Sequence, residues 1–299
     1  MNRQYATVAP VTESKVPAFR IGPDMQRVVR LTNDDKAEVL AFLSIRPVHT
    51  VVMTSFINDN GVESELNRGV FYGYRSREGK LEGVALIGHS TLVEARTNDA
   101  LHALAIAASR SETPIHLIMS SGDDANRFWN CMGMTGAPRL TCTETLFEAA
   151  FPFAVRSTDR KVKKATMEWL LPVAEAQAEV AFIECGVDPL LKDREGFLKR
   201  VARRIEQGRI FIVTDGDKLV FKTDIIAETS EAVYLEGIFV AEEFRGQGIG
   251  SECLAALTLE LLDRAEHISL LSNVEFESAH KSFIKAGYRQ TDHCTTLFV

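Results

Sequence analysis

Three glycines and an arginine stand close together in the run Arg245-Gly246-Gln247-Gly248-Ile249-Gly250. Glycine has no Cβ, so a ligand can approach the main chain closely there and the φ angles can be positive. An arginine adds a charged, forked hydrogen-bond donor. If a helix starts at this run, its unpaired N–H groups and its dipole add a further preference for anions. The spacing therefore predicts a phosphate site built largely from main chain.

The flanking residues predict the elements that would position this site. Residues 233–240 form an apolar run rich in β-branched and aromatic side chains, which is typical of a strand. From Ile249 onward, apolar side chains recur at Cys253, Leu254, Leu257 and Leu261, which places them on one face of a helix. The glycines thus lie between a strand and the N-terminus of a helix.

Two known kinds of phosphate site do not fit this arrangement. A P-loop needs a lysine after its last glycine, but Ser251 and Glu252 follow Gly250. A dinucleotide site needs its glycines directly after the first strand of a large parallel sheet, whereas here residues 241–244 intervene and only about fifty residues remain. A third kind, the pyrophosphate loop of coenzyme A acyltransferases, stays compatible.

Residues 240–250 resemble the signature loop of the GNAT superfamily of N-acetyltransferases, which reads Arg or Gln, two residues, Gly, one residue, then Gly or Ala. A strand at residues 268–272 and a last helix that ends in Gly287-Tyr288 also resemble the family. The resemblance implies an enzyme that binds acetyl-CoA as its co-substrate and needs no metal. It also implies that the strand at residues 233–240 diverges from the next strand and that the pantetheine arm lies between them.

The resemblance further implies which residues hold the cofactor. The backbone of Ile238, Phe239 and Val240 would pair with pantetheine as an added strand would. Asn273, His280 and Phe283 would also reach pantetheine, although a turn or helix-capping role is the alternative for Asn273. The pyrophosphate would be held by the amides of Arg245, Gly246, Gln247, Gly248, Ile249, Gly250 and Ser251.

Family members transfer the acetyl group by direct attack of a primary amine on the thioester, in a ternary complex. The amine must lose a proton first, and Glu236 is the candidate base, with an outward-facing strand residue as the alternative. Phe283 occupies the place of the tyrosine that commonly protonates the departing thiolate, so that proton would come from water. We therefore expect an N-acetyltransferase, with a non-catalytic acyl-CoA-binding regulatory protein as the alternative.

Two local matches indicate a duplication. Residues 125–133 resemble residues 279–287, and residues 79–81 resemble residues 217–219 at a hairpin turn. The first copy offers only residues 90–98 where the second has its glycine loop. We expect a tail at 1–24, a degenerate GNAT-like domain at 25–155 that shapes the acceptor pocket or the interface, and an acetyl-CoA-binding GNAT domain at 156–299.

Each domain is expected to be an α/β (α+β) unit with a mixed, largely antiparallel twisted sheet flanked by helices. The strands expected from alternation and β-branched runs are residues 26–31, 71–74, 81–88, 115–120, a first strand of the second half that ends at 164–165, 210–213, 219–227, 233–240, 268–272, and two short finishing strands near 289 and at 295–299. The helices expected from apolar periodicity are residues 32–43, 51–58, 98–110, 123–132, 166–182, 196–207, 249–262 and 277–286.

Composition sets the outer limits. The chain has 299 residues, 45% of them hydrophobic and 25% charged, which suits two soluble domains. A formal net charge of −7 disfavours a nucleic-acid-binding protein and is compatible with cationic substrates. Five scattered cysteines without a CxxC pair indicate neither zinc nor disulfides. With no apolar run near the length of a membrane span, we expect a cytoplasmic protein. A small-molecule or protein amine as acceptor, and a homodimer, stay open.

Overall fold

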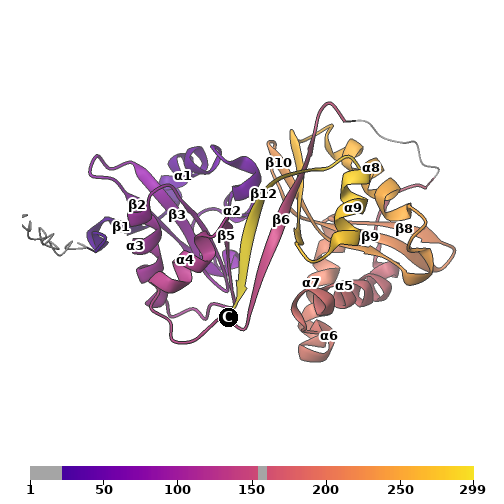
Figure 1. Ribbon diagram of the computed structural model, residues 1–299, viewed down its shortest axis with the longest axis horizontal. Coiled ribbons are helices and arrows are strands. Elements are labelled where there is room, and N and C mark those ends of the chain that lie inside the picture. Colours follow the sequence, from indigo (N-terminus) through magenta and orange to yellow (C-terminus); the bar gives the residue numbers. More distant parts are fainter. Residues whose placement is uncertain (1–21, 154–159) are drawn as a thin grey trace, which may run out of the picture.

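The computed structural model describes residues 22–153 and 160–299, and these residues form one sheet of twelve strands with helices on both faces (Figure 1). The strands are β1 Val28–Arg30, β2 Gly69–Arg75, β3 Leu81–Gly88, β4 Ser90–Ala95, β5 Leu117–Ser121, β6 Leu140–Ala150, β7 Lys163–Lys164, β8 Ile210–Asp215, β9 Lys218–Glu228, β10 Ala232–Val240, β11 His267–Asn273 and β12 Arg289–Phe298. The helices are α1 Lys36–Leu43, α2 Pro47–Asn60, α3 Asn98–Ser109, α4 Asp124–Cys131, α5 Leu170–Cys185, α6 Pro189–Lys192, α7 Arg194–Glu206, α8 Ile249–Leu261 and α9 Glu277–Lys285.

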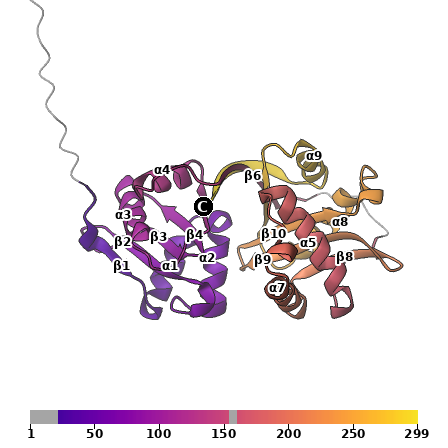
Figure 2. The same ribbon diagram turned by 90° about the horizontal axis from the view of Figure 1, so that it is seen from below.

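The strand order, β1-β2-β3-β4-β5-β12-β6-β11-β10-β9-β8-β7, shows that the two halves exchange their last strands. β12, from the end of the chain, pairs antiparallel with β5 of the first half. β6, which follows the first half's last helix, pairs antiparallel with β11 of the second half. β6 and β12 also pair with each other, so they form the centre of the continuous sheet. In Figure 2 these two strands bridge the halves.

Each half has the expected layers, because alternate strand residues face opposite helices. In the first half, Ala85 and Ile87 pack against α3 and α4, whereas Val84 and Leu86 pack against α1 and α2. In the second half, one core lies between the sheet and α8 and α9, and another lies against α5 and α7. The mixed sheet flanked by helices confirms the expected fold class.

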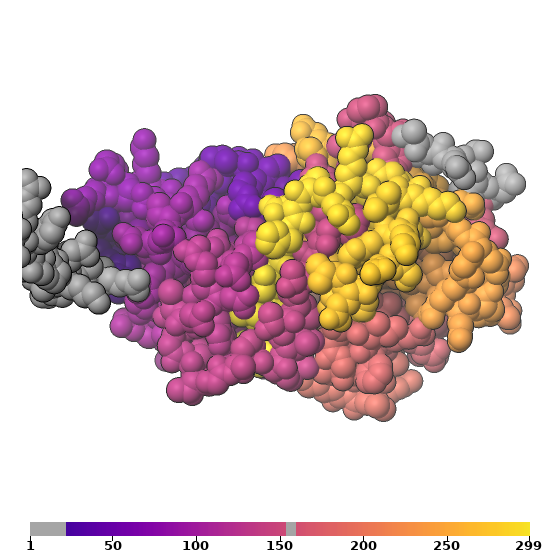
Figure 3. Space-filling model, in the orientation of Figure 1, coloured from indigo at the N-terminus to yellow at the C-terminus, as the bar shows by residue number. Residues whose placement is uncertain are grey.

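The exchanged strands also exchange core residues. Phe147 of β6 is fully buried in the core of the second half. Leu297 of β12 is fully buried in the core of the first half. In the space-filling view, the C-terminal residues, coloured yellow, lie at the junction of the two halves and extend over the second half (Figure 3). Neither half therefore completes its own core.

Helix α2 makes a further contact between the halves. It begins at Pro47, which suits the first turn because proline has no N–H to leave unpaired. Val51 of α2 packs in one cluster with Ala232 and Tyr234 of β10. Ser55 of α2 accepts a hydrogen bond from the amide of Glu228 at 3.3 Å. Helix α2 of the first half thus packs against strands of the second half, on one face of the sheet.

Most of the elements expected from the sequence form, and two strands were missed. No strand was expected at the residues of β4 or at those of β6. The short helix α6 was also not expected, and the two short finishing strands are one long strand, β12. The predicted tail lies almost entirely outside the described residues, and the predicted boundary at residue 155 lies there too. Within the described ranges, every helix is too short or too polar to span a bilayer.

Candidate functional site

The candidate site lies where β10 and β11 diverge. The two parallel strands pair only from Ala232 with His267 to Leu235 with Leu270. Beyond Leu235, β10 continues to Val240 without a partner in β11, and it stays paired with β9 alone. Gly237 and Ile238 form a bulge there, because both oppose the single residue Thr223 of β9. Among the described residues, the edge of β10 at residues 236–240 that faces the gap therefore has no strand partner.

The glycine loop lies at the end of this gap. After a short 3₁₀ turn at Glu242–Phe244, the chain reaches Gly246 and Gly248, whose φ angles of 76° and 83° lie in the left-handed region that glycine tolerates. Gly248 then caps α8. In the described part of the chain, the amides of residues 246–251 have no protein acceptor. Six N–H groups are thus free beside a helix N-terminus, which suits an anion.

The side chains of the predicted loop make contacts mostly within the protein. Arg245 donates from Nε to the carbonyl of Val240 at 2.8 Å and pairs with Glu179 of α5 at 2.8 Å. Gln247 donates to the carbonyl of Glu243, and the Ser251 hydroxyl donates to the carbonyl of Gly248. These side chains hold the shape of the loop, and its amides remain for a ligand.

Lys285, in the last turn of α9, is a cation near the loop that the sequence reasoning missed. A Cβ placed on Gly248 would lie 3.3 Å from the Lys285 Nζ. A Cβ on Gly250 would lie 2.9 Å from Val240, so Gly250 also lets the helix start close to β10. The signal in the sequence was weak, since a lysine at the end of a helix also serves the helix dipole.

Three of the remaining predicted cofactor residues lie on β10. Ile238 and Val240 are half-buried and pack against the core beneath α8 and α9. Phe239 lies between these two residues in the sequence, and the Arg245 guanidinium is 5.9 Å from the centre of its ring. Their main chain is the part of β10 that has left β11. All three therefore lie along the gap.

Asn273, His280 and Phe283 lie near β6 of the first half. The Asn273 side chain accepts a hydrogen bond from the Glu275 amide at 3.0 Å, so it shapes the turn after β11. His280 and Phe283 of α9 meet the ring of Phe147 edge-on, at 4.9 Å and 5.3 Å between ring centres. Phe283 is buried in the core. His280 Nε2 is buried without a hydrogen-bond partner among the described residues.

Glu236, the predicted base, lies on β10 just before the bulge. Its carboxylate accepts a hydrogen bond from the Tyr234 hydroxyl at 2.9 Å. The side chain is reached by solvent, but it lies deep among protein atoms, and this burial raises the pKa of Glu236 above its usual value of 4.5. The positive charge of Arg204 and the Tyr234 hydrogen bond oppose that rise. A raised pKa makes the carboxylate a better proton acceptor than an ordinary glutamate.

Two further carboxyl groups lie near Glu236, and sequence reasoning missed both. Burial raises the pKa of Glu144 on β6, and that of Glu184 on α5, to about 7, and the charge of Glu236 adds to each rise. The Thr296 hydroxyl donates to Glu144 at 2.5 Å and opposes the rise there. The same three charges raise the pKa of Tyr234, after the larger effect of burial. No local pattern could reveal this group, because β6 reaches it only through the strand exchange.

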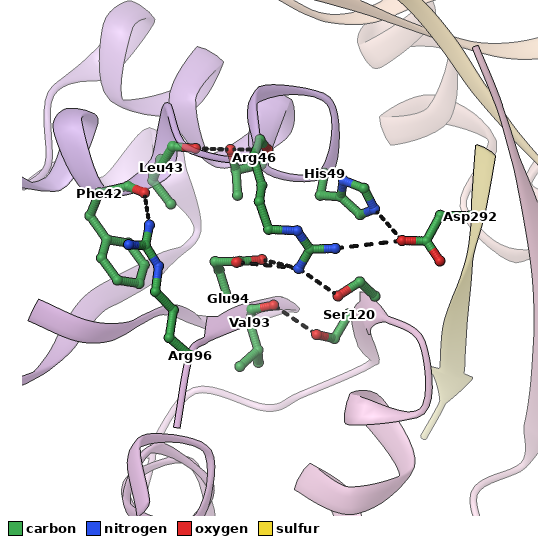
Figure 4. Close-up of polar contacts among 11 residues, drawn as sticks. Phe42, Leu43, Arg46, His49, Val93, Glu94, Arg96, Ser120 and Asp292 are labelled. Carbon is green, nitrogen blue, oxygen red and sulfur yellow. Dashed lines mark hydrogen bonds and ion pairs between the residues drawn. The ribbon is translucent and has the colours of Figure 1, made fainter. Parts of the chain in front are cut away.

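The first half has a similar divergence of strands, but its gap is filled by charged side chains. β4 and β5 pair only from Ser90 to Leu92. Beyond that point, Arg46 bonds both oxygens of buried Glu94, at 3.3 and 3.2 Å. Arg46 also lies 3.6 Å from Asp292 of β12, which His49 contacts at 2.9 Å (Figure 4). A cavity of only about 40 Å³ remains beside this network and reaches Tyr234.

Comparison with known proteins agrees with this geometry. Residues 206–290 match the family model of the acetyltransferase (GNAT) domain. Nothing among the curated proteins matches the sequence. Within the described residues, no group of three or more His, Cys, Asp or Glu side chains is placed to hold a metal ion.

Several solved structures share the fold. The chain is similar to an acetyltransferase of the GNAT family from Colwellia psychrerythraea, with 16% identity, a TM-score of 0.56, and coverage of 91% of this chain and 98% of that one. It is similar to a tandem GNAT protein from the clavulanic acid biosynthesis pathway, with 13% identity, a TM-score of 0.56 and the same coverage. A GCN5-related N-acetyltransferase from Sphaerobacter thermophilus gives 10% identity, a TM-score of 0.54, and coverage of 92% and 95%. Residues 206–290 therefore form a domain of the GNAT acetyltransferase family, and the whole chain has the fold of tandem GNAT proteins.

Proposed function

We propose that the chain transfers an acetyl group from acetyl-CoA to a primary amine, and that the second half binds the cofactor. The observation that carries this proposal is the free edge of β10 beside six unpaired amides at the start of α8. An extended pantetheine arm can pair with the edge as an added strand does. The pyrophosphate would then meet the amides of residues 246–251 and the charge of Lys285.

In the proposed reaction, the neutral amine attacks the thioester carbonyl carbon, and the carbon–sulfur bond breaks. Glu236 accepts the proton that the amine loses, because its raised pKa brings it closer to that of the donor. Phe283 has no hydroxyl and is buried in the core, so the thiolate takes its proton from water. The products are an amide and free coenzyme A.

The surroundings of Glu236 support a cationic acceptor. Glu144 and Glu184 add two carboxyl groups near it, from β6 and from α5. Their charges attract an ammonium group and concentrate it near the base. Because β6 belongs to the first half in sequence, the acceptor site would draw on both halves. This arrangement is compatible with a small amine and with a lysine or N-terminal amine of a peptide.

We propose that the first half does not bind coenzyme A. Arg46 and its partners Glu94 and Asp292 occupy the gap between β4 and β5, where a pantetheine arm would have to lie. The first half also lacks a glycine loop in residues 90–98. Its role would be to supply β6 and α2 to the wall of the acceptor site.

The test is release of coenzyme A thiol from acetyl-CoA in a screen of primary amines, followed by mass detection of the amide. The control is Gly248→Glu, which adds a negative charge and a side chain at the left-handed cap of α8. We expect amine-dependent thiol release by the wild-type protein and none by the variant. Equal coenzyme A affinity of the two proteins would overturn the proposal.

The second candidate function is a non-catalytic acyl-CoA-binding regulatory protein. The observation that favours it is Phe283, which packs edge-on against Phe147 in the place of the usual tyrosine. Tight binding of acetyl-CoA by calorimetry, without thiol release by any amine in the screen, would support this function over the first.

A further inference from the structure

A buried lysine of the neighbouring strand β9 donates a hydrogen bond to the main chain at the bulge of β10. Lys222 of β9 is fully buried, and its Nζ donates to the carbonyl of Gly237 at 3.2 Å. It also donates to the side chain of Gln177 of α5. Burial lowers the pKa of Lys222, and the charge of Asp224 opposes that effect. A buried ammonium group is costly unless it is paired and hydrogen-bonded, so this contact calls for an explanation.

The ammonium group is part of a chain of charges that ends beside Glu236. Asp224, buried on the same strand, pairs with Lys222 at 2.8 Å. Arg204 of α7 pairs with Asp224 at 3.2 Å. Asp224 is the register partner of Glu236, and the preceding residue, Thr223, donates from its hydroxyl to the Glu236 carbonyl at 3.1 Å. Two side chains of β9 therefore fix two consecutive carbonyl groups of β10, those of Glu236 and Gly237.

The backbone of Gly237 fits this contact closely. Its φ angle of 61° is left-handed. A Cβ there would lie 2.6 Å from Lys222 Nζ and 2.5 Å from the Gln177 side chain. The glycine therefore brings its carbonyl onto the ammonium group at a distance that a side chain would prevent. The bulge and the lysine are matched to each other.

We infer that Lys222 is a positioning residue of the acyl-transfer site: its contact with the Gly237 carbonyl sets the bulge, and thereby the direction of Glu236 and the divergence of β10 from β11. This inference rests on the proposed function for its catalytic consequence. The structural part, that the ammonium group holds residues 236–240 in place, does not depend on it.

The experiment compares two variants that break the same ion pair in different ways. Lys222→Met removes the ammonium group and the donor to Gly237, and keeps an unbranched side chain of similar length. Asp224→Asn removes the negative charge and keeps the lysine and its bond to Gly237. We expect kcat to fall at least about tenfold in Lys222→Met and KM for acetyl-CoA to rise, because residues 236–240 line the proposed pantetheine site, with smaller changes of both in Asp224→Asn.

The pH profiles of the two variants separate positioning from general damage. Glu236 is faced by Tyr234 on its own strand, by Glu144 and Glu184, and by Lys222, Asp224 and Arg204. Lys222 lowers the pKa of Glu236 and Asp224 raises it. The acid limb of kcat/KM should therefore move to higher pH in Lys222→Met and to lower pH in Asp224→Asn. A purely structural defect would shift the acid limb in the same direction in both variants, or in neither of them.

Gly237→Ala disturbs the same contact and serves if Lys222→Met fails to fold. It removes neither charge of the buried ion pair between Lys222 and Asp224. It should reduce kcat as Lys222→Met does. Amide hydrogen exchange of residues 236–240 should also be faster in each variant than in the wild type, with β8 unchanged as the reference. Wild-type turnover with unchanged kcat, unchanged pH profile and unchanged exchange in these variants overturns the inference. No wild-type turnover, with faster exchange in the variants, overturns the proposed function and leaves the positioning of the bulge supported.

Discussion

Glu236 is the base of the proposed reaction, because its carboxylate lies beside the diverging strands. Glu236→Gln keeps the size of the side chain and an oxygen that can accept from the Tyr234 hydroxyl. It cannot accept a proton. We expect kcat to fall by roughly 10²-fold, the usual contribution of a general base, with the acetyl-CoA dissociation constant nearly unchanged. Steady-state kinetics and calorimetry measure the two quantities.

The pH profile of the wild-type enzyme gives the control for this substitution. The base acts in its ionised form, so the rate should rise with pH through the pKa of Glu236, which lies above 4.5. That rise should be absent from the residual activity of Glu236→Gln. An unchanged profile in the variant would assign the proton to another group.

Glu144 should affect stability in a way that depends on pH. Its pKa is raised to about 7 in the folded protein, from 4.5, so the folded state binds more protons than the unfolded state between these values. Stability then falls as pH rises from 4.5 to 7. The shift corresponds to roughly 3 kcal/mol once the group is ionised. Glu144→Gln should therefore raise the melting temperature at pH 8 and change it little at pH 4.5.

Glu195→Gln is the matched control for that measurement, because Glu195 lies on the exposed face of α7 with 82% of its side chain accessible. It should leave the melting temperature unchanged at both pH values. A lower melting temperature for Glu144→Gln at pH 8 would show that the ionised carboxylate, with its Thr296 contact, stabilises the fold.

At the scale of elements, the start of α8 is the part that a sequence can predict best. The glycine loop follows a local rule, since Gly246 and Gly248 are needed for positive φ angles and a helix follows at once. β6 was missed because its membership in the sheet is decided by partners far away in the chain. Glu144 was missed with it. The bulge at Gly237 depends on a lysine of the neighbouring strand, and strand alternation does not reveal such a contact.

Alanine substitutions at two glycines, one in the loop and one outside it, separate the cost of backbone strain from the loss of acetyl-CoA binding. Gly248 and Gly136 both have left-handed φ angles, 83° and 96°, and a Cβ on Gly136 would meet nothing within 4 Å. Alanine at either position should cost about 1 kcal/mol in unfolding free energy, from backbone strain alone. Only Gly248→Ala should also weaken acetyl-CoA binding, about tenfold or more, because it tilts the amides of residues 246–251. Denaturant unfolding and calorimetry test the pair. Equal acetyl-CoA affinity of both variants would remove the loop from the binding site.

At the scale of the whole molecule, the exchange of β6 and β12 makes the two halves depend on each other. Phe147 completes the core of the second half, and Leu297 completes that of the first. β11 would present an unpaired edge without β6, as β5 would without β12. An exposed edge and an open core favour aggregation. The exchange also brings Glu144 to the proposed acceptor site, so folding and the proposed chemistry share the same strand.

Expression of the chain as two fragments, residues 1–153 and 160–299, tests this dependence. We expect each fragment to aggregate when made alone, and the pair to copurify as a one-to-one complex when made together, because β6 and β12 each complete the other fragment's sheet. Phe147→Asp in the first fragment should prevent the complex, since that ring is fully buried in the partner core. Phe151→Asp is the matched control, because Phe151 lies just beyond β6 and is 60% exposed. A soluble, monomeric fragment 160–299 that binds acetyl-CoA as tightly as the whole chain would show that the second half folds without the first, and that β6 contributes only to the acceptor side.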